Sequence, residues 1–190
     1  MNLFSSHTTH ILKNGGIEII PTDTIYGISG SAFSPKTVEH IYECKWRDLD
    51  KPFIILISSF DDLELFEVFL GEKEKLFLKT VWPGKVSVIL NVPDESFSYL
   101  YRGFGSLSFR FPDNKKLTSF FKETGPLVST SANIQGNIYA KNIFEAKKYF
   151  GDKIDFYEDA GELDSLPSTL VKIDNGAIYI LREREVKIKS

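Results

Sequence analysis

Residues 15–27 read GGIEIIPTDTIYG, and this stretch decides how the fold begins. The two glycines predict a turn, the largely apolar run at 17–20 predicts a short buried strand, and Pro21 predicts the end of that strand. Two threonines, an aspartate and a tyrosine follow at once. Threonine and aspartate after a strand are ordinary turn formers, but so many hydroxyls at the exit from a core strand also favour a ligand site. Other parts of the sequence have to indicate which ligand would bind there.

Outward from this stretch, predicted helices first alternate with strands and then give way to them. A helix is expected over 34–47, with Ser34 as its N-cap and Pro35 in its first turn. Further helices are expected over 60–71, 72–84, 114–124 and 140–151. Strands are expected over 51–58, 85–92, 106–112, 126–130, 154–159, 168–174 and 177–183, the last two joined by a turn at 174–177. This order predicts an α/β fold in one domain, residues 1–190: a twisted open sheet of mixed parallel and antiparallel strands with flanking helices.

Composition narrows the classes of function. The 190 residues include 23 basic and 26 acidic side chains, and the formal charge of −3 argues against a dedicated, strongly basic nucleic-acid binder. Cys44 is the only cysteine, so no internal disulfide and no CxxC metal site can form, and a buried thiol is expected. The first residues lack the basic and apolar regions of a signal peptide, and no apolar run approaches the roughly 20 residues of a membrane helix. We expect a cytoplasmic protein with no membrane partner.

Several familiar motifs are incomplete. Gly84-Lys85 lacks the other residues of a P-loop, and GFGSLS at 103–108 lacks the third glycine and the helix of a dinucleotide fingerprint. His7 and His10 have no acidic partner nearby, so surface positions are expected for them. No catalytic triad, Cys-His pair or carboxylate pair stands out. The chemistry of an enzyme with this sequence would therefore rest on positioning and electrostatics, as transfer at a nucleotide phosphate does.

Three stretches carry the candidate chemistry: PTDTIYG at 21–27, KWR at 45–47 and PLVSTSANIQG at 126–136. Two cations at a helix end suit a polyphosphate better than a single carboxylate. Hydroxyls, an amide and backbone N–H groups after a strand can bind phosphate oxygens. Taken singly, each stretch is more often a turn or a solvated helix end. Their conjunction favours a nucleotide site.

With these three stretches in order, the sequence resembles the YrdC-like threonylcarbamoyl-AMP synthase family. That family carries a PT-acid-T-hydrophobic-YG strand end, a K-x-R motif and an S-x-N motif, present here as PTDTIYG, KWR and SAN. Weaker matches at 82–90, 106–114, 167–174 and 177–183 extend the resemblance over nearly the whole chain, in the short, single-domain bacterial form. The resemblance implies a twisted open α/β sheet enclosing a positively lined concave site.

The resemblance also implies an activity. Members are ATP-dependent nucleotidyltransferases that make threonylcarbamoyl-AMP and pyrophosphate from L-threonine, bicarbonate and ATP. The product serves N6-threonylcarbamoyladenosine (t6A37) modification of ANN-decoding tRNAs, so the implied partners are tRNA-threonylcarbamoyl transfer proteins and tRNA or other RNA. Mg²⁺ held mainly by the ATP phosphates is the implied ion, and no protein metal ligand is expected.

Matching positions imply the site residues. Lys45 and Arg47 would be the catalytic residues, acting on the ATP phosphates. The residues implied to bind ATP are Lys45, Arg47, Ser131, Asn133 and Arg182, and those implied to bind L-threonine are Thr22, Arg110, Ser129 and Ser168. The Thr24 hydroxyl is expected to contact the same amino acid, and Tyr26 to wall its pocket.

Four positions depart from the family's usual residues. Asp48 and Lys85 each stand where proline is usual, Asn114 replaces a frequent histidine, and Glu183 replaces a glycine. Asp48 matters most, because a carboxylate beside a phosphate site weakens anion binding.

Two other functions would use the same residues. An RNA-binding or ribosome-maturation module without synthase activity needs the basic concavity but no threonine-sized pocket, and its binding would weaken steeply with salt. A carbamoyl-transferring domain of the hydrogenase-maturation type is disfavoured, because zinc-finger cysteines and neighbouring domains are missing.

Overall fold

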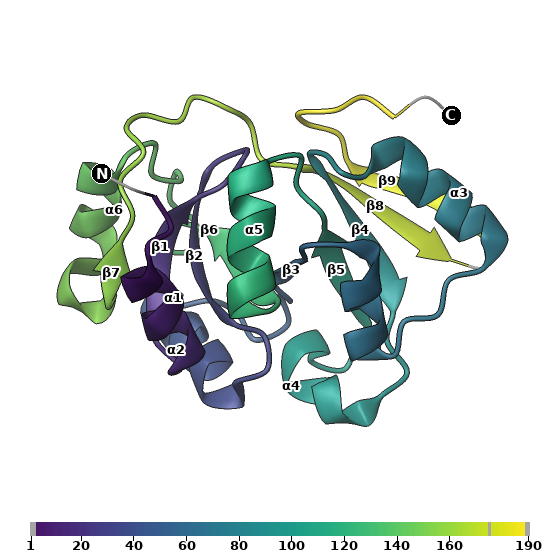
Figure 1. The fold of residues 1–190 in the computed structure, drawn as a ribbon, viewed down its shortest axis with the longest axis horizontal. Helices are drawn as coiled ribbons and strands as arrows, with labels where there is room; N and C mark the ends of the chain where they lie inside the picture. Colours follow the sequence, from purple (N-terminus) through teal and green to yellow (C-terminus); the bar gives the residue numbers. More distant parts are fainter. Residues whose placement is uncertain (1–2, 175, 189–190) are drawn as a thin grey trace.

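The computed structural model describes residues 3–174 and 176–188, and within them nine strands form one sheet (Figure 1). The strand order is β7-β1-β2-β6-β3-β5-β4-β8-β9. The strands are β1 Ile17–Pro21, β2 Tyr26–Ser31, β3 Ile54–Leu56, β4 Val86–Asn91, β5 Ser106–Arg110, β6 Leu127–Ser131, β7 Phe156–Tyr157, β8 Thr169–Asp174 and β9 Ala177–Arg182. The α-helices are α1 Ser6–Lys13, α2 Pro35–Lys45, α3 Glu72–Val81, α4 Ser98–Tyr101, α5 Lys115–Thr124 and α6 Ile143–Phe150, and the 3₁₀ helices are η1 Phe60–Phe66, η2 Glu95–Phe97 and η3 Gly151–Lys153.

The sheet is mixed in strand direction. β1 pairs in parallel with β7, β3 with β5, and β4 with β8, whereas the other neighbours are antiparallel. Helices flank this sheet, and α5 crosses one of its faces (Figure 1). The predicted fold class, an open mixed α/β sheet with flanking helices, is confirmed.

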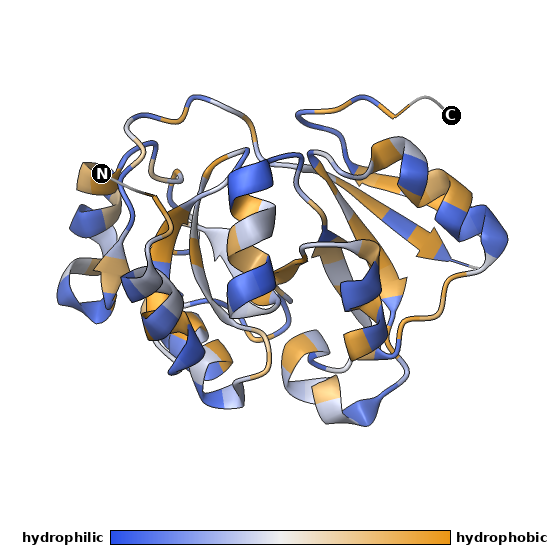
Figure 2. Cartoon of the chain, viewed as in Figure 1, coloured by the Kyte–Doolittle hydropathy of each residue, from blue (hydrophilic) through white to orange (hydrophobic). Residues whose placement is uncertain are grey.

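Alternating side chains give the sheet two different faces. Along β6, Val128 packs into the larger hydrophobic cluster, whereas Leu127 packs into a smaller one with residues of α1 and α5. The helices that cover the sheet carry both apolar and polar positions, as one-sided packing requires (Figure 2). Ser129 and Ser131 follow Leu127 on the face of the smaller cluster. Hydroxyls therefore appear on this face where its apolar packing ends.

Helix α2 begins as the sequence predicts and ends earlier than expected. The Ser34 side chain accepts a hydrogen bond from the Thr37 backbone N–H at 3.3 Å, and Pro35 occupies the first turn. Trp46 then adopts the left-handed conformation with φ of 51° and ends the helix. The reversal separates the directions taken by Lys45 and Arg47, which flank Trp46 in the sequence.

The sequence patterns predict neither α1 nor β2. Strand β2 contains Gly27 and Gly30, which are poor strand formers. A Cβ on Gly27 would lie 2.5 Å from Ser129 Oγ, and one on Gly30 would lie 2.3 Å from Thr37 Cγ2. Both glycines are therefore needed for close packing of β2 against β6 and α2, a tertiary requirement that overrides local propensity.

Other predicted elements change type or length. The helix expected over 60–71 is only the 3₁₀ helix η1, which ends at Glu67 with φ of 54°. The strands expected over 51–58 and 154–159 shrink to β3 and β7. The turn expected at 174–177 includes Asn175, which lies outside the described residues.

Smaller expectations can be checked on the same structure. Cys44 is buried, and His7 and His10 are exposed. In the described part of the chain, no helix combines the length and apolar character needed to cross a bilayer.

Glu18 of β1 is fully buried, and neither of its carboxylate oxygens has a hydrogen-bond partner among the described residues. Burial, reinforced by the nearby charges of Glu158 and Asp155, raises the pKa of Glu18 to about 8 from an ordinary 4.5. Between these two values the folded protein holds a proton that the unfolded chain has released. Stability therefore falls as pH rises through this window.

We expect the free energy of unfolding to fall by about 2–3 kcal/mol between pH 5 and pH 7 because of this proton. The change Glu18→Gln should remove most of that dependence, since the amide has no proton to lose. Urea unfolding at several pH values measures it, with the exposed Glu64→Gln as the matched control that keeps the wild-type slope. An unchanged slope in Glu18→Gln would contradict the assignment.

Candidate functional site

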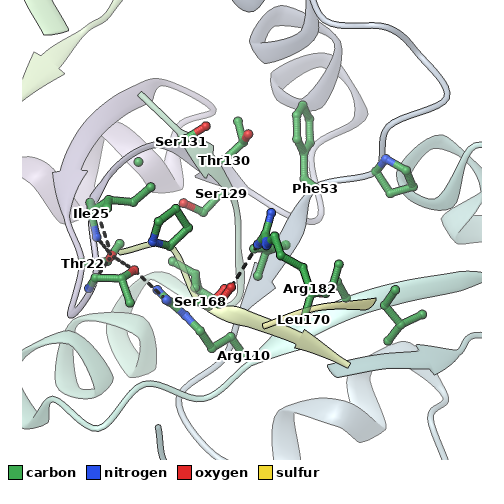
Figure 3. Close-up of a pocket in the computed structure, with 18 of the residues that line it drawn as sticks. Thr22, Ile25, Phe53, Arg110, Ser129, Thr130, Ser131, Ser168, Leu170 and Arg182 are labelled. Atoms are coloured by element: carbon green, nitrogen blue, oxygen red, sulfur yellow. Dashed lines mark hydrogen bonds between the residues drawn. The ribbon is translucent and has the colours of Figure 1, made fainter. Parts of the chain in front are cut away.

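A cavity of about 440 Å³ opens on the sheet face that carries Ser129 and Ser131. Of the nine residues proposed from sequence, seven line this cavity, and they come from three strands, β5, β6 and β9, and from loops. Figure 3 labels all of them except Arg47. The seven are Thr22, Arg47, Arg110, Ser129, Ser131, Ser168 and Arg182. Lys45 and Asn133 do not line the cavity.

The threonines after β1 build a tight turn at one end of the cavity. The Thr22 hydroxyl donates to the Ile25 carbonyl at 2.7 Å and accepts from the backbone N–H groups of Thr24 and Ile25, each at 3.2 Å. Thr24 Oγ1 accepts a hydrogen bond from Arg110 Nη1 at 2.8 Å. Both threonines line the cavity, but the Thr22 hydroxyl is largely committed to the turn. The ordinary turn-forming role of this residue is therefore present in the structure.

Arg110 and Asp23 form a buried ion pair behind that turn. Arg110 Nη2 lies 3.1 Å from Asp23 Oδ1, and the side chains are only 4% and 7% exposed. Burial raises the pKa of Asp23 and lowers the pKa of Arg110, while each charge counteracts the shift of the other. Arg110 Nε has no hydrogen-bond partner among the described residues. This end of the cavity thus holds a fixed guanidinium whose hydrogen-bonding capacity is only partly used.

Ser129 lies beside this charged end. Its Oγ accepts a hydrogen bond from Ser29 Oγ at 2.9 Å, and the bare backbone of Gly27 leaves room for it. Because Ser29 is the donor, the Ser129 proton remains to be donated, and the described residues supply no acceptor for it. Ser129 can therefore donate to a ligand here, and so can Ser108, whose Oγ has no hydrogen-bond partner among the described residues.

Tyr26 does not wall the cavity, contrary to expectation. It is fully buried, and its hydroxyl donates to the Gly161 carbonyl at 2.8 Å and accepts from the Ala160 N–H at 2.9 Å. Neighbouring residues of β2 point to opposite faces, so the face that exposes Gly27 to the cavity turns Tyr26 away from it. Tyr26 instead anchors the segment that leads to β8.

Lys45 connects the KWR and SAN stretches by hydrogen bonds without lining the cavity. Its side chain is 1% exposed, and Nζ donates to the backbone carbonyls of Ser131 and Asn133 and to Asn133 Oδ1, the last at 3.3 Å. The Lys45 carbonyl accepts from the Gln135 N–H at 3.1 Å. Burial, with a smaller contribution from Arg47, lowers the pKa of Lys45 to about 7. Lys45 thus holds the shape of the loop rather than facing the cavity.

The same loop is closed by internal contacts of the SAN stretch. Ser131 Oγ donates to Asn133 Oδ1 at 2.6 Å, and Asn133 Nδ2 donates to the Asn137 carbonyl at 2.7 Å. Asn133 is therefore committed to the loop, and Ser131 is the member of the pair that lines the cavity.

Arg47 faces the cavity, and backbone carbonyls orient it. Nε donates to the Lys51 carbonyl at 2.8 Å, Nη2 donates to the Pro52 carbonyl at 3.2 Å, and the guanidinium lies 5.3 Å from the centre of the Phe53 ring. Burial lowers the pKa of Arg47. These contacts leave Arg47 as the cation of the KWR stretch that lines the cavity.

Asp48, the most troubling departure from the family pattern, is neutralised locally. Its carboxylate accepts from Lys51 Nζ at 2.5 Å and from Gln135 Nε2 at 2.6 Å, and its N–H donates to Gln135 Oε1 at 2.9 Å. The hydrogen bonds from Lys51 and Gln135 lower the pKa of Asp48. Gln135, to which the sequence assigned no role, therefore ties the KWR loop to the SAN loop. Only a contact between distant segments could have revealed it.

Two further departures from the family's usual residues have structural partners: Lys85 forms an ion pair, and Asn114 caps a helix. Lys85 Nζ lies 2.6 Å from Glu185, whose second oxygen accepts from the Leu166 N–H at 3.2 Å, so the chain after β9 is fastened beside the cavity wall. Arg182 Nη2 donates to the Ser168 carbonyl at 3.1 Å on that wall (Figure 3). Asn114 caps α5 by accepting from two backbone N–H groups.

The described residues contain no cluster of three or more histidine, cysteine, aspartate or glutamate side chains that could hold a metal ion.

The sequence matches a known protein family over most of its length. The family model Sua5/YciO/YrdC, described as telomere recombination, matches residues 10–184. A curated relative from Cellvibrio japonicus, named threonylcarbamoyl-AMP synthase, is 28% identical over 153 residues, which cover 79% of this chain and 80% of that protein.

Two solved structures share the fold. The crystal structure of Pyrococcus abyssi Sua5 complexed with L-threonine is 26% identical with a TM-score of 0.84, and the match covers 93% of this chain. It covers 52% of the Sua5 chain, so this chain spans about half of that longer protein. E. coli YciO has a TM-score of 0.86 over 96% of this chain and 90% of its own, and at 20% identity that likeness concerns the fold alone.

Proposed function

The chain belongs to the Sua5/YciO/YrdC family, and from that premise we propose that it is an L-threonylcarbamoyladenylate synthase. It would make threonylcarbamoyl-AMP and pyrophosphate from L-threonine, bicarbonate and ATP. The product would serve t6A37 formation in ANN-decoding tRNAs, with separate transfer proteins as partners. We also propose that the enzyme is cytoplasmic and that residues 1–190 form one domain.

One observation carries the proposal. Three stretches far apart in the sequence meet at a single cavity of about 440 Å³, with Arg110 at the hydroxyl-rich end and Arg47 and Arg182 elsewhere in its lining. A cavity of this size fits a compact small-molecule ligand. Separate guanidinium groups suit an amino-acid carboxylate and a polyphosphate better than one anion.

The residue roles follow the contacts. The Arg110 guanidinium would bind the L-threonine carboxylate, with Ser129 donating to the substrate and Thr22 and Ser168 shaping the pocket. Arg47, Ser131 and Arg182 would bind the nucleotide. Lys45 and Asn133 would act on the nucleotide through the loop that they hold.

The proposed reaction has two steps. The threonine amine attacks CO₂ derived from bicarbonate, and loss of one proton leaves a carbamate. A carbamate oxygen then attacks the α-phosphorus of ATP, and the bond to the bridging oxygen breaks as pyrophosphate leaves with its electron pair. Arg47 and Arg182 would offset the charge that develops on the leaving group. Positioning two substrates in one hollow supplies much of the remaining acceleration.

ATP enters this scheme as a substrate, and its phosphates would hold Mg²⁺ with few protein ligands. When bound, the ion would neutralise part of the phosphate charge, and Arg47 and Arg182 would neutralise more of it.

The test is pyrophosphate release from ATP, measured with and without L-threonine and bicarbonate. The proposed synthase releases pyrophosphate only when both are present. Salt-sensitive RNA binding without threonine-dependent release would instead support an RNA-binding module.

The pocket should discriminate poorly against L-serine. Serine keeps the hydroxyl and lacks only the methyl group, and a missing methyl typically lowers kcat/KM by about 10- to 200-fold. Alanine lacks the hydroxyl and should be rejected further, because the site's polar groups are left unpaired. Pyrophosphate release with each amino acid measures the two ratios. Equal rejection of serine and alanine would count against a hydroxyl-recognising pocket.

A further inference from the structure

Phe104 is an exposed aromatic residue at the cavity. Its side chain is 59% exposed, yet it belongs to the lining. Among the large exposed apolar side chains of the described residues, no other lines this cavity. An aromatic ring left open to water beside a ligand cavity is a candidate binding surface.

The backbone presents this ring from a defined turn. Gly103 and Gly105 have φ of 89° and 62°, and Arg102 before them has φ of 51°. A Cβ on either glycine would meet nothing within 4 Å, so these positions need glycine for conformation and not for space. The Phe104 N–H donates to the Tyr101 carbonyl at 3.0 Å, and the Gly105 carbonyl accepts from the Val92 N–H at 2.9 Å. These two backbone hydrogen bonds thus hold the backbone of Phe104 in place, and with it the position from which the ring extends.

Phe104 and Arg110 stand at opposite ends of the same strand. Ser106, Ser108 and Arg110 line the cavity along β5, and Phe104 comes just before that strand. The four residue steps from Ser106 to Arg110 span about 13 Å at about 3.3 Å each, and Phe104 lies beyond the Ser106 end. Ile54 and Ile89, which pair with Ser108 on either side, are also in the lining. Toward Phe104 the cavity lining therefore gains apolar and aromatic side chains, beside the Arg47 guanidinium that donates to the Pro52 carbonyl.

We propose that Phe104 is the stacking platform for the nucleobase of ATP, and this inference rests on the proposed synthase function. Of the three proposed substrates, L-threonine and bicarbonate have no flat apolar surface, whereas the adenine ring does. With the amino acid at Arg110 and the phosphates near Arg47 and Arg182, the base of an extended adenylate reaches the apolar end. Phe104 would determine affinity for the base without touching the reacting atoms.

Calorimetric titration of the full chain with ATP and, separately, with inorganic tripolyphosphate tests the proposal. Phe104→Ala should weaken ATP binding by about 5- to 50-fold, since base–aromatic stacking is typically lost at this scale on truncation. Tripolyphosphate affinity should stay within about twofold, because that probe has no base. Phe104→Trp should restore ATP affinity, whereas Phe104→Leu, apolar but not aromatic, should not. Phe144→Ala removes another exposed phenylalanine, from α6 and outside the cavity, and should change neither titration.

Three outcomes would overturn the inference. Wild-type ATP affinity in Phe104→Ala would show that the ring does not contact the base. Equal weakening of ATP and tripolyphosphate would show a general distortion of the site. A wild-type protein that binds tripolyphosphate but not ATP would remove the nucleotide and the proposed synthase function together, whereas the first outcome leaves that function standing.

Discussion

Replacing Lys45 by methionine is expected to reduce threonine- and bicarbonate-dependent pyrophosphate release by about 100-fold or more, the scale of loss when catalytic groups are displaced by about 1 Å. The substitution keeps the length of the side chain but removes every hydrogen bond from Nζ to Ser131 and Asn133. Their carbonyls then lose a buried charged donor, and each unsatisfied acceptor costs about 1–3 kcal/mol. The loop that carries Ser131 into the cavity should relax away from its position.

Lys36→Met is the matched control, because Lys36 is exposed in the first turn of the same helix. It removes the same charge from α2 and should retain normal turnover and thermal stability. Near-normal pyrophosphate release by Lys45→Met would exclude Lys45 from the site altogether. Thermal melts of both variants show whether enough folded protein remains for the comparison.

Local sequence patterns correctly predicted those helices and strands whose formation depends mainly on residues close in the sequence. The Ser34 cap and Pro35 placed the start of α2 correctly, and alternation placed β4 and β5 within a residue or two. Strand β2 was missed because its glycines are explained by Ser129 and Thr37, residues that local propensity cannot take into account.

The candidate site shows the same division. Seven of the proposed residues line one cavity, so residue type and motif order selected residues that the fold brings together, and their roles stay a prediction. Side-chain direction was less predictable: Lys45 and Arg47 are two residues apart, yet the left-handed turn at Trp46 sends one into the loop and the other to the cavity. Lys51, three residues on, compensates the charge of Asp48. Gln135, which also holds that carboxylate, is 87 residues away in the sequence, so no local pattern could have shown this second contact.

Replacing Arg110 by methionine should lower both stability and threonine use. Asp23 would remain buried without its counterion, and breaking a buried pair in this way costs about 3–5 kcal/mol of folding free energy. Loss of the charged partner of the substrate carboxylate should reduce kcat/KM for L-threonine by about 100- to 1000-fold. Urea unfolding measures the first effect, and pyrophosphate release at varied L-threonine measures the second.

The double variant Arg110→Met/Asp23→Asn separates these two roles. Removing the orphaned carboxylate should restore most of the lost stability, because no uncompensated charge is then buried. It should not restore threonine use, since the guanidinium is still missing, and ATP affinity should stay near the wild-type value because Arg47 and Arg182 are intact. If the double variant instead uses L-threonine with wild-type kcat/KM, Arg110 serves only to balance Asp23, and the amino-acid end of the cavity must lie elsewhere.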